Sequence, residues 1–328
     1  MKNFNWGIVG LGNIAVKMAD ALKLCDNANL YAVASRSSDK AEAFRAEHGA
    51  DKAYGHYDAL YNDPNIDIVY IATTHNAHYS CAMDAIAAGK HVLIEKPMAV
   101  NECEVSGIIE TAKKHGVFAM EALWTRFLPV YNDVHDWVNN GLIGEIRSVT
   151  ADFMIGPFEE TNGWRLFDPE TAGGALLDLG IYPINFAAAF LGAVPCDTGG
   201  TAILSELGAD INDAVYLRYE NAVASFRTGL VSTAPNTGKI NGSKGYIELD
   251  SCVFSKKACL YSIDHKLLQT SEYEYKNGFE FEARHTMERI TNGYTESDVM
   301  PLSETLKIVR IMDILRKKWG VVYPFEKI

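Results

Sequence analysis

The chain has 328 residues, 48% of them hydrophobic, and a formal net charge of −12. This length is enough for two hydrophobic cores, and an acidic chain without a basic stretch argues against nucleic acid or an anionic membrane surface as a partner. The start of the chain has no signal-peptide core, and we recognise no apolar run long enough to span a bilayer. The six cysteines have no paired short spacing, which favours reduced thiols and a cytoplasmic location. No third ligand follows the close pair His75 and His78 at a recognisable spacing, so no metal site is predicted.

The first residues predict a strand, a tight turn and a helix. Gly10, Gly12 and Ala15 match the G-x-G-x-x-A form of the dinucleotide-binding fingerprint. Gly10 permits the turn, Gly12 lets the backbone approach a pyrophosphate, and the N-terminus of the helix faces the anion. The residues predicted to bind the cofactor in this turn are Gly10, Leu11, Gly12, Asn13 and Ile14.

The second predicted strand, Leu30–Ala34, is followed by Ser35, Arg36 and Ser37. An NAD site usually has an acidic residue here to accept a hydrogen bond from the ribose 2′-hydroxyl, and none is present. The guanidinium of Arg36 instead suits a 2′-phosphate, with the hydroxyls of Ser35 and Ser37 as additional donors. We therefore expect NADP rather than NAD. The alternative is that Ser37 or Ser38 only caps the following helix while Arg36 lies in solvent.

Strands and helices continue to alternate as far as the strand Val117–Glu121. This pattern predicts an α/β fold with a doubly wound parallel sheet, and a dinucleotide-binding Rossmann-type domain over residues 1–122. Ligands of such sheets bind at the carboxyl ends of the strands, so the ends of the strands Ile66–Ala72 and Val92–Ile94 become candidates for lining the cofactor. His78 lies one turn into a helix, where a lone histidine is more often a packing or capping residue. The candidates at these two strand ends are Ala72, Thr73, Thr74, Asn76, His78, Glu95, Lys96 and Pro97.

Glu95, Lys96 and Pro97 are the most informative of these residues. Pro97 fixes its own φ and has no backbone donor, so the chain must turn there, through a trans or a cis bond. A lysine that is partly desolvated beside a cationic nicotinamide ring loses its proton more easily than one in water, which makes Lys96 a candidate proton relay. The alternative is a solvated Glu–Lys pair that only caps the strand.

Past Glu121 the pattern changes, and residues 123–328 are predicted to form a second, α+β domain for substrate binding and dimerisation. Alternating apolar and polar residues over Asn212–Glu220 and Ala222–Gly229 predict a β-hairpin within an open, mainly antiparallel sheet. The other predicted strands cover residues 144–153, 246–249, 253–263 and 267–275, and the predicted helices cover 124–140, 279–292 and 304–319.

The stretch Gly173–Pro183 contains an acid and a phenol that stand out in this second domain. Asp178 and Tyr182 are four residues apart, so on one helical turn they share a face. From the residues alone, two interpretations of this pair are equal. It is either a functional site or a pair with a structural role at the surface or in the core.

Four features in this order carry a resemblance to a known family. They are the glycine turn at residues 10–15, the strand Ile68–Ala72 with Thr73 and His78, the motif Glu95–Pro97 and the stretch Gly173–Pro183. Together they resemble the glucose-fructose oxidoreductase / inositol dehydrogenase / rhizopine-catabolism family of NAD(P)-dependent oxidoreductases. Further markers are similar to the branch of dimeric dihydrodiol dehydrogenases and NADP-dependent D-xylose dehydrogenases. These markers are Glu121–Pro129, Trp164 with Arg165, and residues 296–304.

The resemblance implies that Tyr182 donates a proton, that Asp178 binds or orients the substrate, and that one face of the C-terminal sheet forms a homodimer interface. We therefore expect hydride transfer between NADP and a hydroxyl-bearing carbon of a sugar, polyol or cyclic trans-diol. The side chains expected to shape the substrate pocket are Trp124, Phe153 and Phe158, and those expected to reach the cofactor are Trp164 and Arg165.

Several alternatives stay open at this point. The aromatic side chains could instead pack in the core, and Arg165 could form an interdomain ion pair. An NAD-dependent inositol or sugar dehydrogenase is favoured only if Arg36 points away from the ribose. A non-catalytic NAD(P)-sensing regulator is the alternative from another class, because the family includes a transcriptional co-repressor.

Overall fold

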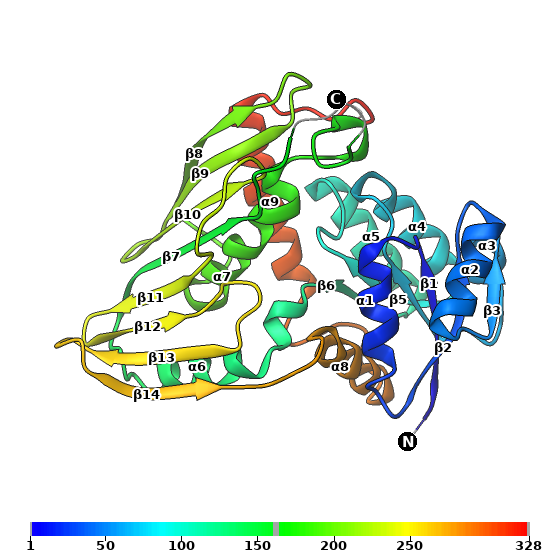
Figure 1. Cartoon of the computed structure of the whole chain (residues 1–328), viewed down its shortest axis with the longest axis horizontal. Helices are drawn as coiled ribbons and strands as arrows, with labels where there is room; N and C mark the ends of the chain where they lie inside the picture. The colour runs from blue at the N-terminus through cyan, green and yellow to red at the C-terminus, as the bar shows by residue number, and fades with distance from the viewer. Residues whose placement is uncertain (1, 160–163, 327–328) are drawn as a thin grey trace. The chain divides into compact units, whose positions relative to one another are not determined.

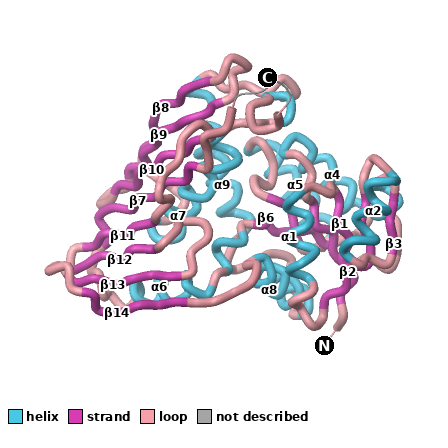
Figure 2. The backbone as a smooth tube through the Cα atoms, in the orientation of Figure 1, coloured by secondary structure: helices cyan, strands magenta, loops and turns pink. Residues whose placement is uncertain are grey.

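The computed structural model describes residues 2–159 and 164–326. It divides into two compact units, one formed by Met1–Phe127 with Lys276–Leu306 and the other by Leu128–Tyr275 with Lys307–Ile328. Figure 1 labels the elements of both units, and Figure 2 distinguishes their strands from their helices by colour.

The first unit is built on sheet A, which has six parallel strands in the order β3-β2-β1-β4-β5-β6. The strand order reverses between β1 and β4, which is where open α/β sheets bind their ligands. The strands are β1 Phe4–Val9, β2 Ala28–Ala34, β3 Lys52–Tyr54, β4 Ile68–Ile71, β5 His91–Glu95 and β6 Ala119–Ala122. The helices are α1 Asn13–Leu22, α2 Ser38–His48, α3 Tyr57–Tyr61, α4 His75–Ala87, α5 Glu102–His115, the 3₁₀ turn Trp124–Phe127 and α8 Phe279–Thr291.

Burial explains the apolar sequences of these strands. Every residue of β4 and β6 is buried, as expected for parallel strands covered by helices on both faces. Two helices begin at caps that the sequence indicates: Ser37 accepts a hydrogen bond from the Lys40 N–H at 3.3 Å, and Asn101 accepts one from the Glu104 N–H at 2.9 Å. The predicted Rossmann-type sheet is confirmed.

The segment Lys276–Leu306 returns to the first unit, so this division differs from the predicted boundary after residue 122. Its helix α8 packs against α1 and the turn that follows it. The guanidinium of Arg284 donates to the backbone oxygen of Leu24 at 2.6 Å, and the Asn277 amide donates to that of Lys17 at 2.8 Å. Such pairings join residues 260 positions apart in the chain, beyond the reach of any local pattern.

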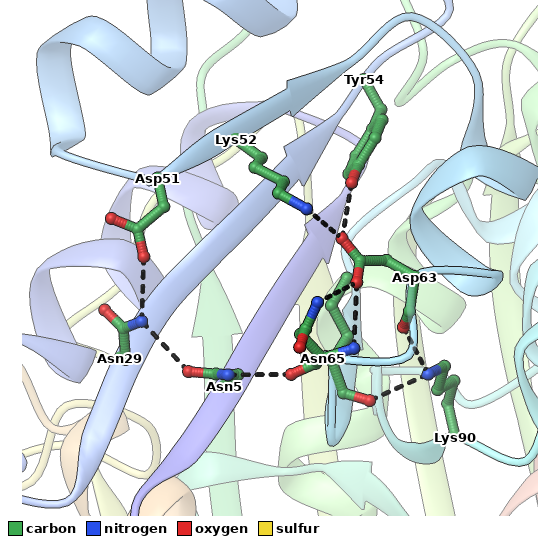
Figure 3. A network of polar contacts seen from close by, with 9 residues as sticks. Asn5, Asn29, Asp51, Lys52, Tyr54, Asp63, Asn65 and Lys90 are labelled. Atoms are coloured by element: carbon green, nitrogen blue, oxygen red, sulfur yellow. Dashed lines mark hydrogen bonds and ion pairs between the residues drawn. The ribbon is translucent and has the colours of Figure 1, made fainter.

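A polar network centred on Asp63 fixes the loop that leads into β4 (Figure 3). The carboxylate of Asp63 accepts hydrogen bonds from Lys52 Nζ at 2.8 Å, the Tyr54 hydroxyl at 2.6 Å and the Asn65 N–H at 2.9 Å. Lys90 Nζ donates to the backbone oxygen of Asp63 at 2.7 Å. Burial acts to raise the pKa of Asp63, but the hydrogen bonds from Lys52, Tyr54 and Asn65 lower it below its ordinary value. This network fastens β3 to the loop that leads into β4.

The second unit is built on sheet B, which has eight strands in the order β14-β13-β12-β11-β7-β10-β9-β8. Among the strands that the structure describes in this sheet, only β7 and β10 are parallel neighbours, so the expected mainly antiparallel sheet is confirmed. The strands are β7 Ile146–Met154, β8 Asp197–Leu204, β9 Asp210–Arg218, β10 Val223–Gly229, β11 Gly238–Gly242, β12 Gly245–Leu249, β13 Lys257–Ser262 and β14 Leu267–Glu272. The helices are α6 Pro129–Asn139, the 3₁₀ turn Pro169–Thr171, the π-helix Leu176–Gly180, α7 Ile181–Leu191 and α9 Leu302–Trp319, whose first turn belongs to the first unit.

Helices α6 and α7 cover one face of sheet B (Figure 1). The continuous stretch Pro169–Leu191, which ends in α7, has the length and mean hydropathy of a membrane-spanning helix. The sequence reading that no such run exists was therefore wrong, since the run joins the π-helix and α7 to the residues that precede them. In the structure, 83% of its most apolar window is buried, as in a core helix of a globular domain.

Candidate active site

The turn between β1 and α1 has the geometry that its glycines predict. Gly10 has φ +83°, and a Cβ there would lie 2.6 Å from backbone atoms of Ala72 and Thr73, so the position requires glycine. A Cβ on Gly12 would meet nothing within 4 Å among the described residues. Gly12 precedes α1 without a side-chain cap, which leaves the start of the helix open to an anion. Leu11 is buried, whereas Asn13 and Ile14 are partly or fully exposed at the helix start.

The residues after β2 lie where the sequence expects the ribose 2′-group. Ser35 is buried and its hydroxyl accepts a hydrogen bond from the Ser37 N–H at 3.3 Å. Ser37 caps α2, as the alternative reading holds. Arg36 is exposed, and its guanidinium forms no hydrogen bond or ion pair with the part of the chain that the structure describes. Capping by Ser37 therefore leaves Arg36 available.

The carboxyl end of β4 is tied to the Lys96–Pro97 turn through His78. The Nδ1 atom of His78 lies 2.8 Å from the Pro97 oxygen, and its Nε2 atom lies 3.1 Å from the Thr73 oxygen. Burial lowers the pKa of this fully buried imidazole to about 3, and the single N–H of a neutral ring can be donated to only one of these two carbonyl oxygens. Ala72 is buried, and the Thr74 hydroxyl donates to Asn76 at 2.7 Å. His78 thus has a structural role, because it connects the end of β4 to the Lys96–Pro97 turn.

Glu95, Lys96 and Pro97 lie at the carboxyl end of β5, and the Lys96–Pro97 bond is cis. Glu95 is buried, with its Oε1 atom accepting from the Tyr70 hydroxyl and its Oε2 atom accepting from the Lys96 N–H at 3.2 Å. Glu95 is therefore not a solvated partner of Lys96, and the simple strand-capping alternative does not describe it. Lys96 itself is only partly buried.

Two buried acids near this turn were not predicted. The carboxylate of Glu121, at the end of β6, accepts from the Met98 N–H at 2.9 Å and the Thr305 hydroxyl at 3.1 Å, and burial raises its pKa to about 7. Glu282 on α8 has no hydrogen-bond partner for either oxygen among the described residues. Burial and then the charge of Glu95 raise the pKa of Glu282 well above its ordinary value. The sequence signal for Glu121 is that it is an acidic residue in an otherwise apolar predicted strand. The sequence has no comparable signal for Glu282.

In the second unit, Asp178 and Tyr182 lie on consecutive elements, the π-helix and α7. Both residues are buried, and Arg165 NH2 lies 3.7 Å from Asp178 Oδ1. The ring of Tyr182 meets the ring of Phe153 edge to face, with centroids 5.4 Å apart. Phe153 in turn contacts the exposed Phe254, which was not among the predicted residues. The structure therefore brings Phe153, Asp178 and Tyr182 together with Arg165.

The remaining predicted aromatic residues fall into two groups. Trp124 belongs to the first unit, where it is buried and stacks on Phe279 with centroids 5.0 Å apart. Trp164 and Phe158 belong to the second unit and meet edge to face at 4.7 Å. The loop between Phe158 and Trp164 includes residues 160–163, which lie outside the described residues.

Comparisons with known proteins identify the family. A model described as the oxidoreductase family with an NAD-binding Rossmann fold matches residues 4–123, and a model of the GFO/IDH/MocA C-terminal domain matches residues 131–248. The chain is 35% identical to trans-1,2-dihydrobenzene-1,2-diol dehydrogenase from Mus musculus over 98% of either chain. The human enzyme of the same name is 33% identical, with the same coverage.

Solved structures agree with this fold. A 3-ketoreductase from Actinomadura kijaniata, in complex with NADP and TDP-benzene, is 26% identical with a TM-score of 0.86, covering 96% of this chain and 98% of that one. An aldose-aldose oxidoreductase from Caulobacter crescentus, complexed with glycerol, shares the fold at 23% identity, with a TM-score of 0.85 and coverage of 96% and 97%. The resemblance drawn from the sequence is confirmed. The chain belongs to the Gfo/Idh/MocA family of oxidoreductases.

Proposed function

We propose that the protein is an NADP-dependent dehydrogenase that transfers a hydride between the nicotinamide and a hydroxyl-bearing carbon of a sugar, polyol or cyclic trans-diol. The observation that carries this proposal is the full-length similarity to trans-dihydrodiol dehydrogenases in a chain that has Lys96 at the carboxyl end of β5 and Tyr182 beside Asp178. The edge-to-face contact of Phe153 with Tyr182 supports a cyclic, partly apolar substrate.

The first unit fits the cofactor. The open space above Gly12 and the uncapped start of α1 suit a pyrophosphate, and the exposed Arg36 suits a 2′-phosphate. The A. kijaniata neighbour was crystallised with NADP, which supports the same preference here. Bound NADP supplies the hydride chemistry, and the chain supplies orientation and proton transfer.

In this proposal Tyr182 exchanges the hydroxyl proton with the substrate, and Asp178 holds a second hydroxyl. A tyrosine ordinarily titrates at about pH 10, so it needs a neighbouring positive charge to act near neutrality. Lys96 is the proposed source of that charge. The buried Glu95, fixed by Tyr70 and by the Lys96 N–H, holds the backbone of the lysine in place.

The test is the reduction of NADP and of NAD by the purified protein across trans-dihydrodiols, aldoses and inositols. Lys96→Ala and Tyr182→Phe should each lower kcat by about 100-fold or more, the scale of lost general acid–base catalysis. Lys113→Ala on α5 and Tyr219→Phe, whose hydroxyl donates to the Gly192 oxygen at 2.9 Å, serve as matched controls. Folded variants of Lys96 and Tyr182 with wild-type turnover would refute the assignment. Cofactor binding without turnover of any compound would instead favour the sensing regulator.

We further propose a homodimer formed through the open face of sheet B, in the cytoplasm. The exposed Ile203, Tyr216 and Val223 on strands β8 and β9 and at the start of β10 support the interface. All six cysteines are free, as a reducing compartment favours.

A further inference from the structure

The residues that follow α9 fold back on that helix as a tight turn. The Glu326 N–H donates to the Tyr323 oxygen at 3.0 Å, which closes a β-turn with Pro324 at its second position. Proline is favoured at this position because its fixed φ suits the turn. The turn brings the carboxylate of Glu326 to Arg316, a buried residue on α9.

Arg316 holds this turn through two kinds of contact. Its NH1 and NH2 atoms donate to the two oxygens of Glu326 at 3.0 and 2.9 Å, and NH2 also donates to Asp313 at 3.0 Å. Such a paired contact is the strong form of a guanidinium–carboxylate interaction. The guanidinium carbon also lies 4.4 Å from the centre of the Tyr323 ring. The ring of Tyr323 is therefore fixed on a charged group that is itself fixed.

The hydroxyl of Tyr323 contacts a buried stretch of backbone ahead of the π-helix. It donates to the Gly173 oxygen at 3.1 Å. Burial raises the pKa of Tyr323 well above its ordinary value, so the hydroxyl keeps its proton and remains a donor. Because Gly173 is buried, this hydrogen bond satisfies its oxygen within the protein rather than through solvent.

Gly173 and Gly174 join two segments that carry predicted site residues. The loop before them carries Arg165, and the π-helix after them carries Asp178. A Cβ on Gly173 would lie 2.4 Å from the Arg165 oxygen, so only glycine lets the loop lie this close. The Gly174 N–H donates to the Leu166 oxygen at 2.9 Å, and the Gly174 oxygen accepts from the Asp178 N–H at 3.3 Å. This junction therefore sets the backbone from which Arg165 NH2 and Asp178 Oδ1 come within 3.7 Å of each other.

We propose that Tyr323, held by the Arg316–Glu326 pair, is a positioning residue that fixes Gly173 and so keeps Asp178 in place for the substrate. This inference rests on the proposed function, in which Asp178 holds a second hydroxyl of the substrate. A binding side chain must be held to within about 0.5 Å by the residues that support it. Release of the junction therefore weakens the contact of Asp178 with the substrate.

The test is Tyr323→Phe, which removes the hydroxyl and keeps the ring on Arg316. Asp178 holds its hydroxyl in the bound substrate as well as in the transition state, so a weaker contact raises KM more than it lowers kcat. With trans-1,2-dihydrobenzene-1,2-diol as the probe, KM should rise about 10-fold and kcat should stay within about 3-fold of the wild type. The KM for NADP should change by less than about 3-fold, because most of the predicted cofactor contacts lie in the first unit.

Tyr131→Phe is the matched control. Tyr131 is 1% exposed in the same unit, and its hydroxyl donates to the Cys252 oxygen at 3.2 Å. Both variants lose a buried hydrogen bond from a phenol to a backbone oxygen, but only Tyr323 contacts Gly173 in this way. The KM for the diol should be unchanged in Tyr131→Phe. Equal rises in the two variants would overturn the positioning role.

A second variant tests the support of Tyr323 by the turn. Glu326→Ala removes the carboxylate that Arg316 holds, so it should raise the KM for the diol in the same direction. The variant with both changes should be no worse than Tyr323→Phe, because the two side chains act through one contact and their effects are not additive. Additive effects would contradict the proposed support of Tyr323 by the Arg316–Glu326 pair.

Amide hydrogen exchange provides a measurement that does not depend on activity. The amides of Gly173, Gly174 and Asp178 should exchange about 10-fold faster in Tyr323→Phe and at the wild-type rate in Tyr131→Phe. Unchanged exchange in Tyr323→Phe would overturn the proposal even if KM rises. If the wild type oxidises no diol, sugar or polyol while these amides behave as expected, Tyr323 positions the junction and the proposed function is what fails.

Discussion

The guanidinium of Arg36 is exposed at the carboxyl end of β2, where dinucleotide-binding folds read the ribose 2′-group. We expect Arg36→Ala to raise the KM for NADP by about 10-fold or more and to change the KM for NAD little, because a charge-assisted contact to the 2′-phosphate is lost. Steady-state kinetics with both cofactors measures this. Lys40→Ala removes a neighbouring exposed cation on α2 and should have a smaller effect. Equal changes for both cofactors in Arg36→Ala would contradict the NADP preference.

The buried carboxyl group of Glu121 makes a prediction about stability and pH. Its pKa is raised by burial from 4.5 to about 7, so between these values the folded protein binds a proton that the unfolded chain releases. The stability contributed by this group is complete at low pH and is lost as the pH rises through 7. Glu121→Gln keeps an acceptor for the Met98 N–H without titrating. Between about pH 5 and about pH 8, the free energy of unfolding of the wild type should therefore fall by on the order of 3 kcal/mol more than that of Glu121→Gln.

Urea unfolding of Glu121→Gln and of the wild type at the two pH values provides the measurement. Glu110→Gln, at an exposed position of α5, is the control and should follow the wild-type pH dependence. Parallel pH dependences for wild type and Glu121→Gln would show that Glu121 does not carry a proton in the folded state.

At the scale of elements, the β1–α1 turn contains two glycines with different requirements. Gly12→Ala should fold with wild-type stability, because its Cβ meets nothing among the described residues, yet it should weaken NADP binding by about 10-fold or more by obstructing the pyrophosphate. Gly10→Ala should instead destabilise the protein by about 2 kcal/mol or more, through its positive φ and its contact with the Ala72 backbone. Thermal unfolding and fluorescence titration of NADP separate the two effects. Loss of stability in Gly12→Ala would refute the reading of that turn.

The elements predicted correctly are those with a strong local pattern. The hairpin of β9 and β10 and the strands β1, β2, β4, β5 and β6 of sheet A follow alternation or continuous apolar runs, whereas the three-residue β3 was not predicted. Strands β8 and β11 were not predicted, because β8 begins Asp-Thr-Gly-Gly and β11 has glycine at both ends, and such residues have low strand propensity. The π-helix was read as an ordinary helical turn, since the N–H of its first residue, Leu176, is donated to Asp210 on β9, a partner that no local pattern reveals.

At the scale of the whole molecule, the sequence could not reveal partners that are remote along the chain. Glu121 receives a hydrogen bond from Thr305, 184 residues away, and the charge of Glu95 helps burial to raise the pKa of Glu282 on helix α8. The motif Glu95–Pro97 was identified from its place at a strand end, whereas its buried acidic surroundings come from tertiary structure. The same reason explains why residues 276–306 were assigned to the second domain, although they pack with the first unit.

The open face of sheet B leads to a prediction about assembly. Tyr216 is 42% exposed there, beside a cavity of about 490 Å³ lined by Thr150, Asp152, Ala214, Val215, Tyr216, Ser225, Phe226 and Arg227. Strand pairing places Tyr216 opposite Ser225 and places Ala214 opposite Arg227, so this lining comes mainly from the face that α6 and α7 do not cover. A charge introduced at the centre of such a face opposes association, because the charge must be desolvated without a partner.

We expect Tyr216→Asp to convert the proposed homodimer into a folded monomer, as measured by sedimentation velocity together with circular dichroism. Tyr294→Asp is the matched control, because Tyr294 is 51% exposed in the first unit, and this variant should remain dimeric. A wild-type protein that sediments as a single chain would refute the dimer, and a dimeric Tyr216→Asp would place the interface on another surface. Monomers that keep full turnover would also show that each chain carries a complete site. We expect this result, because every residue of the proposed mechanism belongs to one chain.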